Sequence, residues 1–404
     1  MTSRTSKWIG WVLLFALGLP GGSGFAPVPA GESPGDLEDM PQIILDPSAG
    51  DWVVDRFAGN STAGPTFFQG PAREVGGLGR CGACPLPDGR VLIPFREGLA
   101  EVDAAGTLRL VLETDDLLPG TTLQVTAAVM AWNPKDKHVY VGGRDCVRRL
   151  IERDGMPWEM ESVAGTPGKT GSADGPAREA SFTRIDSIVI DGRGTLFILD
   201  GNRRIRKIED GRVTTLTDAV HSGRLVDGPL AEARFNMIDL GGNLCGGDDD
   251  AALYLSDHWN FAVRKIDLKS MAVSTVAGMP KPAGKSTRER RYNANSDGPA
   301  LTWASFNSGC AYVCWDPVHG ALWCGGPDES RFRWLKDGEV RTVIGAKGVD
   351  RWPRDGLGTP AAAVRLTWNA VVAVDARGGV YLSASSDPNG VWRAVSQRGR
   401  AATQ

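Results

Sequence analysis

The sequence predicts an all-β protein, a six-bladed β-propeller with four antiparallel strands in each blade. Three observations predict this fold: a high glycine and proline content, a unit that recurs through most of the chain, and two chain ends that complement each other. Gly 52 and Pro 25 make up nearly a fifth of the 404 residues, which disfavours long helices and suits short strands joined by tight turns. The 42% hydrophobic content is sufficient for a folded core and argues against a disordered chain.

The recurring unit contains a three-residue anchor whose central residues are 58, 58, 69 and 59 positions apart, with a sixth, degenerate copy near Ala100. An apolar run, a Gly-containing turn and a second run precede the anchor, as in Ser187–Asp200. A third run ending in Gly follows it, as in Ser274–Gly278. Each repeat therefore holds about four strands, the content of one propeller blade. The five clear anchors are Val147–Arg149, Ile205–Lys207, Val263–Lys265, Phe332–Trp334 and Val391–Arg393.

The linkers between repeats also recur, in Asp174–Phe182, Asp227–Phe235 and Asp297–Phe306. Each begins with Asp-Gly-Pro, a combination typical of a turn. Because Ala and Phe follow, we expect each linker to pack back onto its blade.

The two ends of the repeat region indicate how the ring closes. The last repeat supplies three strands, Val371–Asp375, Val380–Ser383 and Val391–Val395, and no fourth. At the front, Asp51–Gly59 has the form of a fourth strand without a blade before it. We therefore predict that this N-terminal strand completes the last blade, which would remove the exposed sheet edges of an open ring. The propeller would span residues 51–395, followed by a polar tail at 396–404.

The N-terminus resembles a secretory signal peptide at residues 1–24. Arg4 and Lys7 precede an apolar run of about 12 residues, which ends at Pro20 and small residues. A bilayer span needs about 20 apolar residues, so a membrane anchor is the less favoured alternative and no stable membrane span is expected. We predict a secreted or periplasmic protein with a flexible spacer at residues 25–50, which is rich in Pro, Gly and acidic residues.

Seven cysteines cannot all pair within one chain, so at least one thiol stays free. Cys310 and Cys314 would lie about 13 Å apart along a strand, too far for a disulfide. Cys314 and Cys324 flank a predicted turn and could face each other. The simplest interpretation of the cysteines is that they are small residues filling the core.

The repeats resemble the NHL repeat, a β-propeller repeat with a Val-Ala-Gly strand end, an Asp-Gly linker and an Asp-x-x-Asn turn before Ile-Arg-Lys. The resemblance covers roughly residues 52–395 and is best in the third and fourth blades. The first blade has Gln69-Gly-Pro and the sixth Asp355-Gly-Leu in place of Asp-Gly-Pro. The resemblance implies that the linkers, and the turns between second and third strands, lie on one face around a central channel. That face is the default binding site.

The turns on that face supply the candidate site residues. Asp and Asn at repeated positions are also explained by hydrogen bonds within their own turns. His258 and Trp259 differ, because an imidazole can act as a base or a ligand and an indole can stack on a ligand. An insertion between Gly278 and Asp297 carries five cations, which could attract an acidic partner or simply keep the loop solvated. The ligand-binding candidates are Arg144, Asp200, Asn202, Arg203, Asp257, His258, Trp259, Asn260, Asp328 and Glu329.

The favoured function is a non-catalytic binding scaffold that takes a protein, peptide or glycan on its channel face and needs no cofactor. A net charge of −3 gives no field that would recruit nucleic acid. One alternative is a metal-dependent enzyme similar to the lactonase-like or amidating-lyase-like propellers, with calcium or zinc as the metal and His258 as the catalytic candidate. A second alternative is a structural ring of a cell-envelope assembly. The sequence determines neither the ligand nor the oligomeric state.

Overall fold

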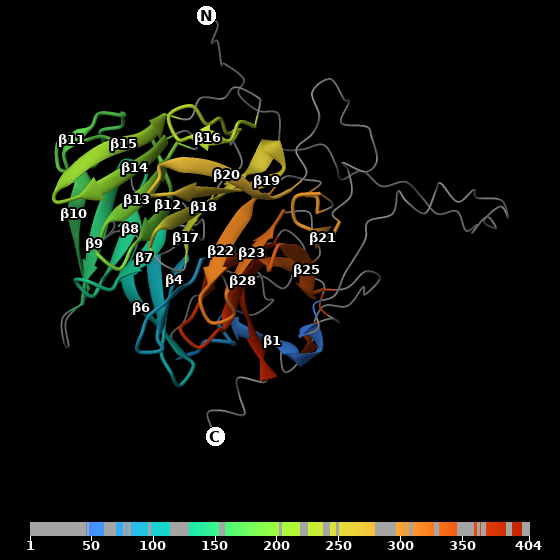
Figure 1. The fold of residues 1–404 in the computed structure, drawn as a ribbon. Helices are drawn as coiled ribbons and strands as arrows, with labels where there is room; N and C mark the ends of the chain where they lie inside the picture. Colours follow the sequence, from blue (N-terminus) through green and yellow to red (C-terminus); the bar gives the residue numbers. More distant parts are fainter. Residues whose placement is uncertain are drawn as a thin grey trace, which may run out of the picture. The chain divides into compact units, whose positions relative to one another are not determined.

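A computed structural model shows a six-bladed β-propeller made almost entirely of strands, which confirms the predicted fold class (Figure 1). The structure describes residues 46–397 except 47, 60–69, 76–77, 79–81, 96–97, 114–128, 153–157, 202–203, 219–224, 237–242, 248–249, 279–295, 303, 307–309, 327–330, 346–358, 362–363, 365–368 and 385–389. The expected signal peptide, nearly all of the spacer and most of the tail lie outside these residues.

Each blade is one antiparallel sheet, and the blades follow one another along the chain. Blade 1 contains β2 (Gly70–Pro71), β3 (Cys84–Pro85), β4 (Val91–Phe95), β5 (Gly98–Val102) and β6 (Thr107–Glu113). Blade 2 contains β7 (Met130–Asn133), β8 (His138–Gly142), β9 (Cys146–Ile151) and β10 (Glu159–Gly165). Blade 3 contains β11 (Gly175–Pro176), β12 (Ile185–Ile190), β13 (Leu196–Asp200), β14 (Arg204–Glu209) and β15 (Arg212–Asp218).

The second half of the ring repeats this order. Blade 4 contains β16 (Gly228–Pro229), β17 (Leu244–Gly246), β18 (Ala252–Asp257), β19 (Ala262–Asp267) and β20 (Ala272–Ala277). A 3-10 helix, η3 (His258–Asn260), joins β18 to β19. Blade 5 contains β21 (Gly298–Pro299), β22 (Tyr312–Asp316), β23 (Ala321–Gly325), β24 (Phe332–Lys336) and β25 (Glu339–Ile344). Blade 6 contains β26 (Thr359–Pro360), β27 (Asn369–Val374), β28 (Val380–Ala384), β29 (Gly390–Ser396) and β1 (Trp52–Ala58), which follows the short η2 (Ala49–Asp51).

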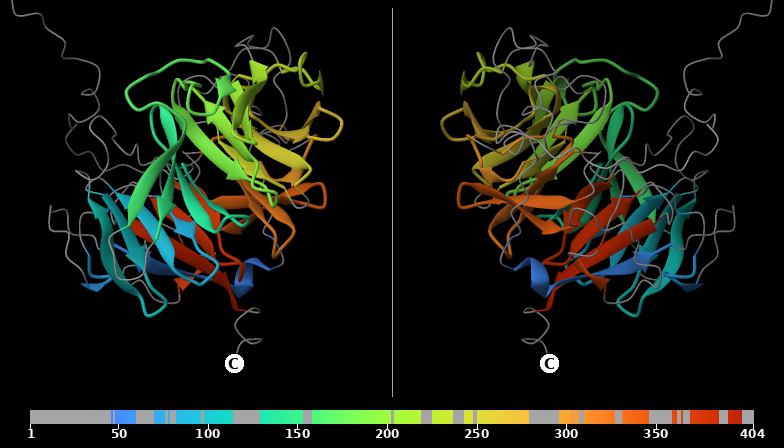
Figure 2. Two further views of the ribbon diagram at one scale, coloured as in Figure 1. Left: turned by 90° about the vertical axis from the view of Figure 1, so that its left-hand side faces the viewer. Right: turned by 90° about the vertical axis from the view of Figure 1, so that its right-hand side faces the viewer.

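The innermost strands of neighbouring blades contact one another around the whole ring, in the order β3, β7, β12, β17, β22 and β27 and back to β3. The two side views show the blades as separate sheets set around this inner ring (Figure 2). Among the described residues, six apolar clusters hold the blades together, one between each neighbouring pair. The core is therefore distributed around the ring.

The N-terminal strand closes the ring as predicted. β1 pairs antiparallel with β29, from Trp52 opposite Ser396 to Ala58 opposite Val391. Blade 6 is therefore assembled from both ends of the described chain, and in Figure 1 the blue β1 lies among the red strands of the last repeat.

The sequence predicted four strands per blade, whereas five of the six sheets contain a fifth, outermost strand of two residues. In blade 3 this strand is Gly175–Pro176 of the Asp-Gly-Pro linker, which pairs with Val213 and Arg212 of β15. Gly175 has a φ of 142°, a conformation that favours glycine. Proline cannot donate a backbone hydrogen bond, so it suits an edge position. The linkers thus cover the outer sheet edges, while the residues before blade 2 fall outside the described part.

No disulfide joins any of the six cysteines among the described residues, and Cys81 lies outside those residues. Cys324 lies opposite Val313 while Cys314 lies opposite Trp323, so Cys314 and Cys324 are not cross-strand partners. Within the described residues, no helix has the length and apolar character needed to cross a membrane.

Candidate binding face at the linkers and turns

The turns between second and third strands come together with the linkers on one face of the ring, as expected. In blade 3, Asp200 Oδ1 accepts hydrogen bonds from the backbone N–H groups of Thr183 (2.7 Å) and Arg184 (3.1 Å). In blade 4, Asp257 Oδ1 accepts from the N–H of Asn236 (2.7 Å), and the Trp259 N–H donates to the Asn236 carbonyl (2.9 Å). We call residues 143–145, 166–184, 200–201, 226–236 and 257–261 the channel face.

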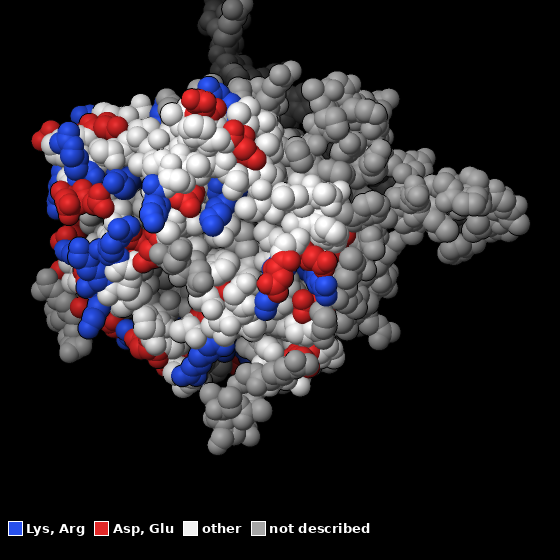
Figure 3. Space-filling model, viewed as in Figure 1, with Lys and Arg blue, Asp and Glu red and all other residues white. Residues whose placement is uncertain are grey.

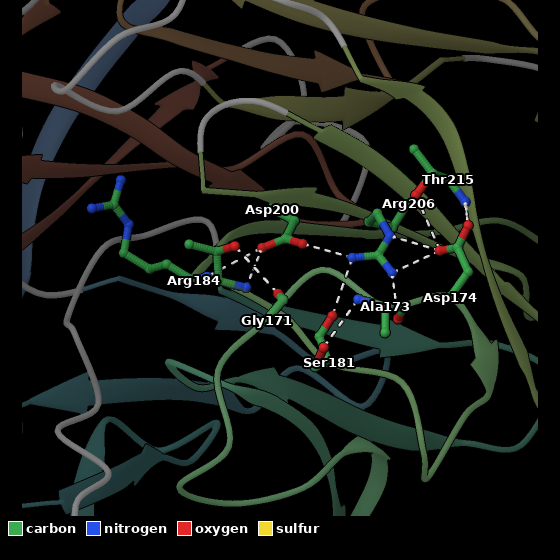
Figure 4. Close-up of polar contacts among 9 residues, drawn as sticks. Gly171, Ala173, Asp174, Ser181, Arg184, Asp200, Arg206 and Thr215 are labelled. Atoms are coloured by element: carbon green, nitrogen blue, oxygen red, sulfur yellow. Dashed lines mark hydrogen bonds and ion pairs between the residues drawn. The ribbon is translucent and has the colours of Figure 1, made fainter.

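In blade 3, a fully buried arginine from the third strand, β14, fixes the turn to its linker. Arg206 Nη1 lies 2.8 Å from Asp200 Oδ2, and its Nη2 lies 2.7 Å from Asp174 Oδ1 (Figure 4). The same guanidinium donates to the carbonyls of Ala173 and Ser181. Asp174 in turn accepts from the N–H and hydroxyl of Thr215 in β15. The recurring Asp of the linker and Asp of the turn are thus the two counter-ions of one buried guanidinium.

Blade 4 repeats this arrangement and blade 5 varies it. Arg264 lies 2.7 Å from both Asp257 and Asp227, and its guanidinium stacks over Phe235. In blade 5, Arg333 donates to the carbonyls of Ser296 and Ser305 and stacks over Phe306. The Phe at the end of each linker therefore forms one wall of the arginine site.

The β18–β19 turn displays one exposed aromatic ring on a buried polar base. Trp259 is 45% exposed, whereas His258 and Asn260 on either side are buried. The Asn260 side chain donates to Asp257 Oδ2 (3.0 Å), and the His258 ring meets the Trp259 ring edge-on at 5.0 Å. Burial raises the pKa of Asp257, and the nearby Arg264 opposes this shift. Buried polar contacts thus hold the turn in place, and the indole of Trp259 lies at the surface.

The structure also shows a pair that sequence reasoning missed. Arg184, whose side chain is 40% exposed, places its Nε 2.6 Å from Asp186 Oδ1. Asp186 sits at a β-bulge, because the pairing of β12 with β13 shifts between Ile185 and Ser187. The sequence signal for this pair was an acidic residue, Asp186, inside an otherwise apolar strand. The bulge could not be predicted, because it depends on how β12 pairs with β13.

The other predicted site residues are placed as follows. Arg144 is exposed in the β8–β9 turn, where the Gly143 carbonyl accepts from the Ile185 N–H of blade 3 (3.4 Å). Asp200 and Asp257 are fully buried, so their carboxylates position the turns. Asn202, Arg203, Asp328, Glu329 and the basic insertion at 279–295 lie outside the described residues. On the side seen in Figure 3, basic and acidic side chains are intermixed over blades 2 and 3.

For the enzyme alternative, a metal would need a cluster of ligands. Among the residues that the structure describes, no group of three or more His, Cys, Asp or Glu side chains could hold a metal ion.

The protein is thus a six-bladed β-propeller, and its candidate site is the channel face, where the linkers hold the turns in place. No family model and no curated protein matches the chain. A structural genomics protein of unknown function from Bacteroides thetaiotaomicron is similar in structure, with a TM-score of 0.61, 15% identity and coverage of 85% of this chain and 76% of that one. Auxiliary nutrient binding proteins from Bacteroides thetaiotaomicron and Bacteroides ovatus both match with a TM-score of 0.56, at 11% and 12% identity and the same coverage. At these identities the similarity shows the fold alone.

Proposed function

We propose that this protein is an exported, NHL-type propeller that binds a protein, peptide or glycan on its channel face without catalysing a reaction. The observation that carries the proposal is Trp259, which is exposed at the surface while the residues around it are fixed. Exposed aromatic rings on rigid supports make strong binding contacts, because little conformational entropy is lost when a ligand covers them.

The support beneath Trp259 is built from buried polar contacts. Asp257 receives hydrogen bonds from Asn236, Asn260 and Arg264. The Trp259 backbone is held separately by the Asn236 carbonyl, and Phe261 ends the turn with a left-handed φ of 56°. These contacts fix the backbone of the turn before any ligand arrives. The similar structures described as auxiliary nutrient binding proteins add that this fold serves ligand binding elsewhere.

The proposal predicts that Trp259→Ala weakens ligand binding at least about 10-fold and changes the free energy of unfolding by less than about 1 kcal/mol. The wild-type protein is first screened on a glycan array and a peptide array. The variant is then tested against the ligands found, with melting curves as the check on folding.

Val318→Ala is the matched control. Val318 is 49% exposed, like Trp259, but lies in the β22–β23 turn at the opposite end of the strands. We expect the control to bind like the wild type. Arrays without a reproducible ligand, or equal binding by wild type and Trp259→Ala, would contradict the proposal.

A further inference from the structure

The guanidinium of Arg184 has a fixed orientation at the seam between blades 2 and 3. Its backbone is bonded to blade 3 on both sides, since its N–H donates to Asp200 and its carbonyl accepts from the Gly201 N–H (2.7 Å). The next residue, Ile185, donates to Gly143 of blade 2. Three backbone hydrogen bonds therefore fix the position of Arg184 before its side chain makes any contact.

The side chain is oriented as well. Asp186 Oδ1 accepts from Nε at 2.6 Å, and the Asp186 side chain is only 12% exposed. β-Bulges turn a side chain away from the regular pattern of a strand, and here the bulge presents Asp186 to Arg184. The largely buried carboxylate thus acts as a positioning group for a more exposed guanidinium.

The two Nη groups of Arg184 remain available. Within the described part of the chain, the Arg184 side chain donates a hydrogen bond from Nε to Asp186, and neither Nη1 nor Nη2 donates one to a protein group. Figure 4 shows the Arg184 guanidinium pointing away from the cluster of Asp200, Arg206 and Asp174. By contrast, Arg206 in the same blade is fully buried and its Nη groups are bound by protein groups. Arg206 thus has a structural role inside the blade, whereas the guanidinium of Arg184 faces outward.

We propose that Arg184 binds a carboxylate group of an acidic oligosaccharide, a proposal that rests on the channel face being a binding site. Two parallel N–H groups of a planar guanidinium match the two oxygens of a carboxylate, which makes such pairs strong and specific in geometry. Arg144 is exposed in the β8–β9 turn of blade 2 and follows Gly143, whose carbonyl accepts from the N–H of Ile185, so it adds positive charge on the other side of this seam.

Two features favour an oligosaccharide over an extended peptide. Peptides often bind by adding a strand to a free sheet edge, and the two-residue strands β2, β11, β16, β21 and β26 already pair with the outer edges of five blades. Trp259 on the same face offers a flat apolar ring, which suits the apolar face of a sugar. The charge on Arg184 then selects sugars that carry a carboxylate.

The test is calorimetric titration of the full chain with hexagalacturonate, with maltohexaose as the neutral sugar and hexaglutamate as the acidic peptide. We expect the wild type to bind hexagalacturonate, more weakly at higher salt, and to bind the other two at least 10-fold more weakly. Arg184→Gln should lose at least 10-fold in affinity for hexagalacturonate. Arg184→Lys should lose less affinity than Arg184→Gln, because it keeps the positive charge. It should still bind more weakly than the wild type, because an ammonium group cannot make the bidentate contact.

The matched control is Arg193→Gln, which removes one exposed cation from the β12–β13 turn of the same blade, outside the channel face, and should bind within 2-fold of the wild type. Asp186→Asn should weaken binding while leaving the salt dependence in place, because the guanidinium keeps its charge but loses its orientation. Melting curves of each variant check the fold.

Three results would overturn the inference: no binding of hexagalacturonate, tighter binding of hexaglutamate, or equal losses in Arg184→Gln and Arg193→Gln. The proposed function is judged separately. If Trp259→Ala abolishes binding of an array ligand that Arg184→Gln still binds normally, the channel face remains a binding site and only the carboxylate assignment fails.

Discussion

Arg206 and Lys207 are adjacent basic residues whose surroundings differ completely. Arg206 is fully buried between Asp200 and Asp174, whereas Lys207 pairs with Glu209 at the surface. Removing one partner of a buried ion pair leaves the other charge without compensation, which costs far more than losing an exposed pair. The repeated Ile-Arg-Lys pattern therefore combines one structural cation with one that matters little for stability.

Arg206→Met should lower the free energy of unfolding by about 3–5 kcal/mol, because Asp200 would remain buried without its counter-ion. Lys207→Met should change it by about 0.5 kcal/mol or less. Urea denaturation of both variants against the wild type measures the difference. Equal stability of the two variants would show that the buried cluster does not anchor the turn.

The candidate site illustrates which functional residues an amino-acid sequence can and cannot indicate. Trp259 was recognisable because it interrupts the regular turn of the best-matching repeat. The importance of Arg184 depends on a bulge at Asp186 and on a contact with Gly143 of another blade. Neither the bulge nor the contact between blades leaves a periodic trace in the sequence, so the pair could only be found in three dimensions.

At the scale of elements, strands with apolar runs were predictable and two-residue strands were not. β13 and β14 have the length and composition of ordinary strands. β11 consists of Gly175 and Pro176, residues that normally mark a turn, and it is a strand only because β15 lies beside it. The linker therefore has two functions in the fold: it crosses between blades and it covers the edge of the next one.

Asp174 attaches this linker strand to blade 3, and its titration provides a test. Partial burial alone would raise the pKa of Asp174, but hydrogen bonds from Thr215 and the guanidinium of Arg206 hold it below its usual value. A carboxylate with a lowered folded-state pKa stabilises the protein fully above the usual pKa of about 4, and this contribution is lost as the pH falls through the folded-state pKa.

Asp174→Asn should therefore be less stable than the wild type at pH 7, and the difference should shrink as the pH falls below about 4. Thermal melting between pH 3 and pH 7 measures this trend. Asp210→Asn, which changes an exposed carboxylate in the β14–β15 turn, controls for the loss of one charge. A stability difference for Asp174→Asn that stays constant down to pH 3 would contradict the assignment.

The whole molecule depends on one long-range closure, which the repeat pattern did predict. Because each apolar cluster of described residues lies between two blades, the described part of a blade forms no complete core by itself. Trp52 from β1 is 1% exposed and meets the rings of Trp323 and Trp334 in blade 5 edge-on, at 5.6 and 6.0 Å. The N-terminal strand thus completes blade 6 and also packs against its neighbour.

Trp52→Ala should therefore loosen the entire ring, and two buried thiols, one on the neighbouring blade 5 and one on the distant blade 2, can report this. Cys146 in blade 2 and Cys324 in blade 5 are both fully buried, and burial raises the pKa of Cys146 to about 12, so native thiols should react slowly with alkylating reagents at pH 8. A cooperative ring requires that both thiols react faster in the variant, and by the same factor, because the same opening exposes both. Mass spectrometry of the modified peptides measures each rate. If Cys324 alone became reactive while Cys146 stayed protected, the closure would be a local contact between blades 5 and 6, and the ring would open one blade at a time.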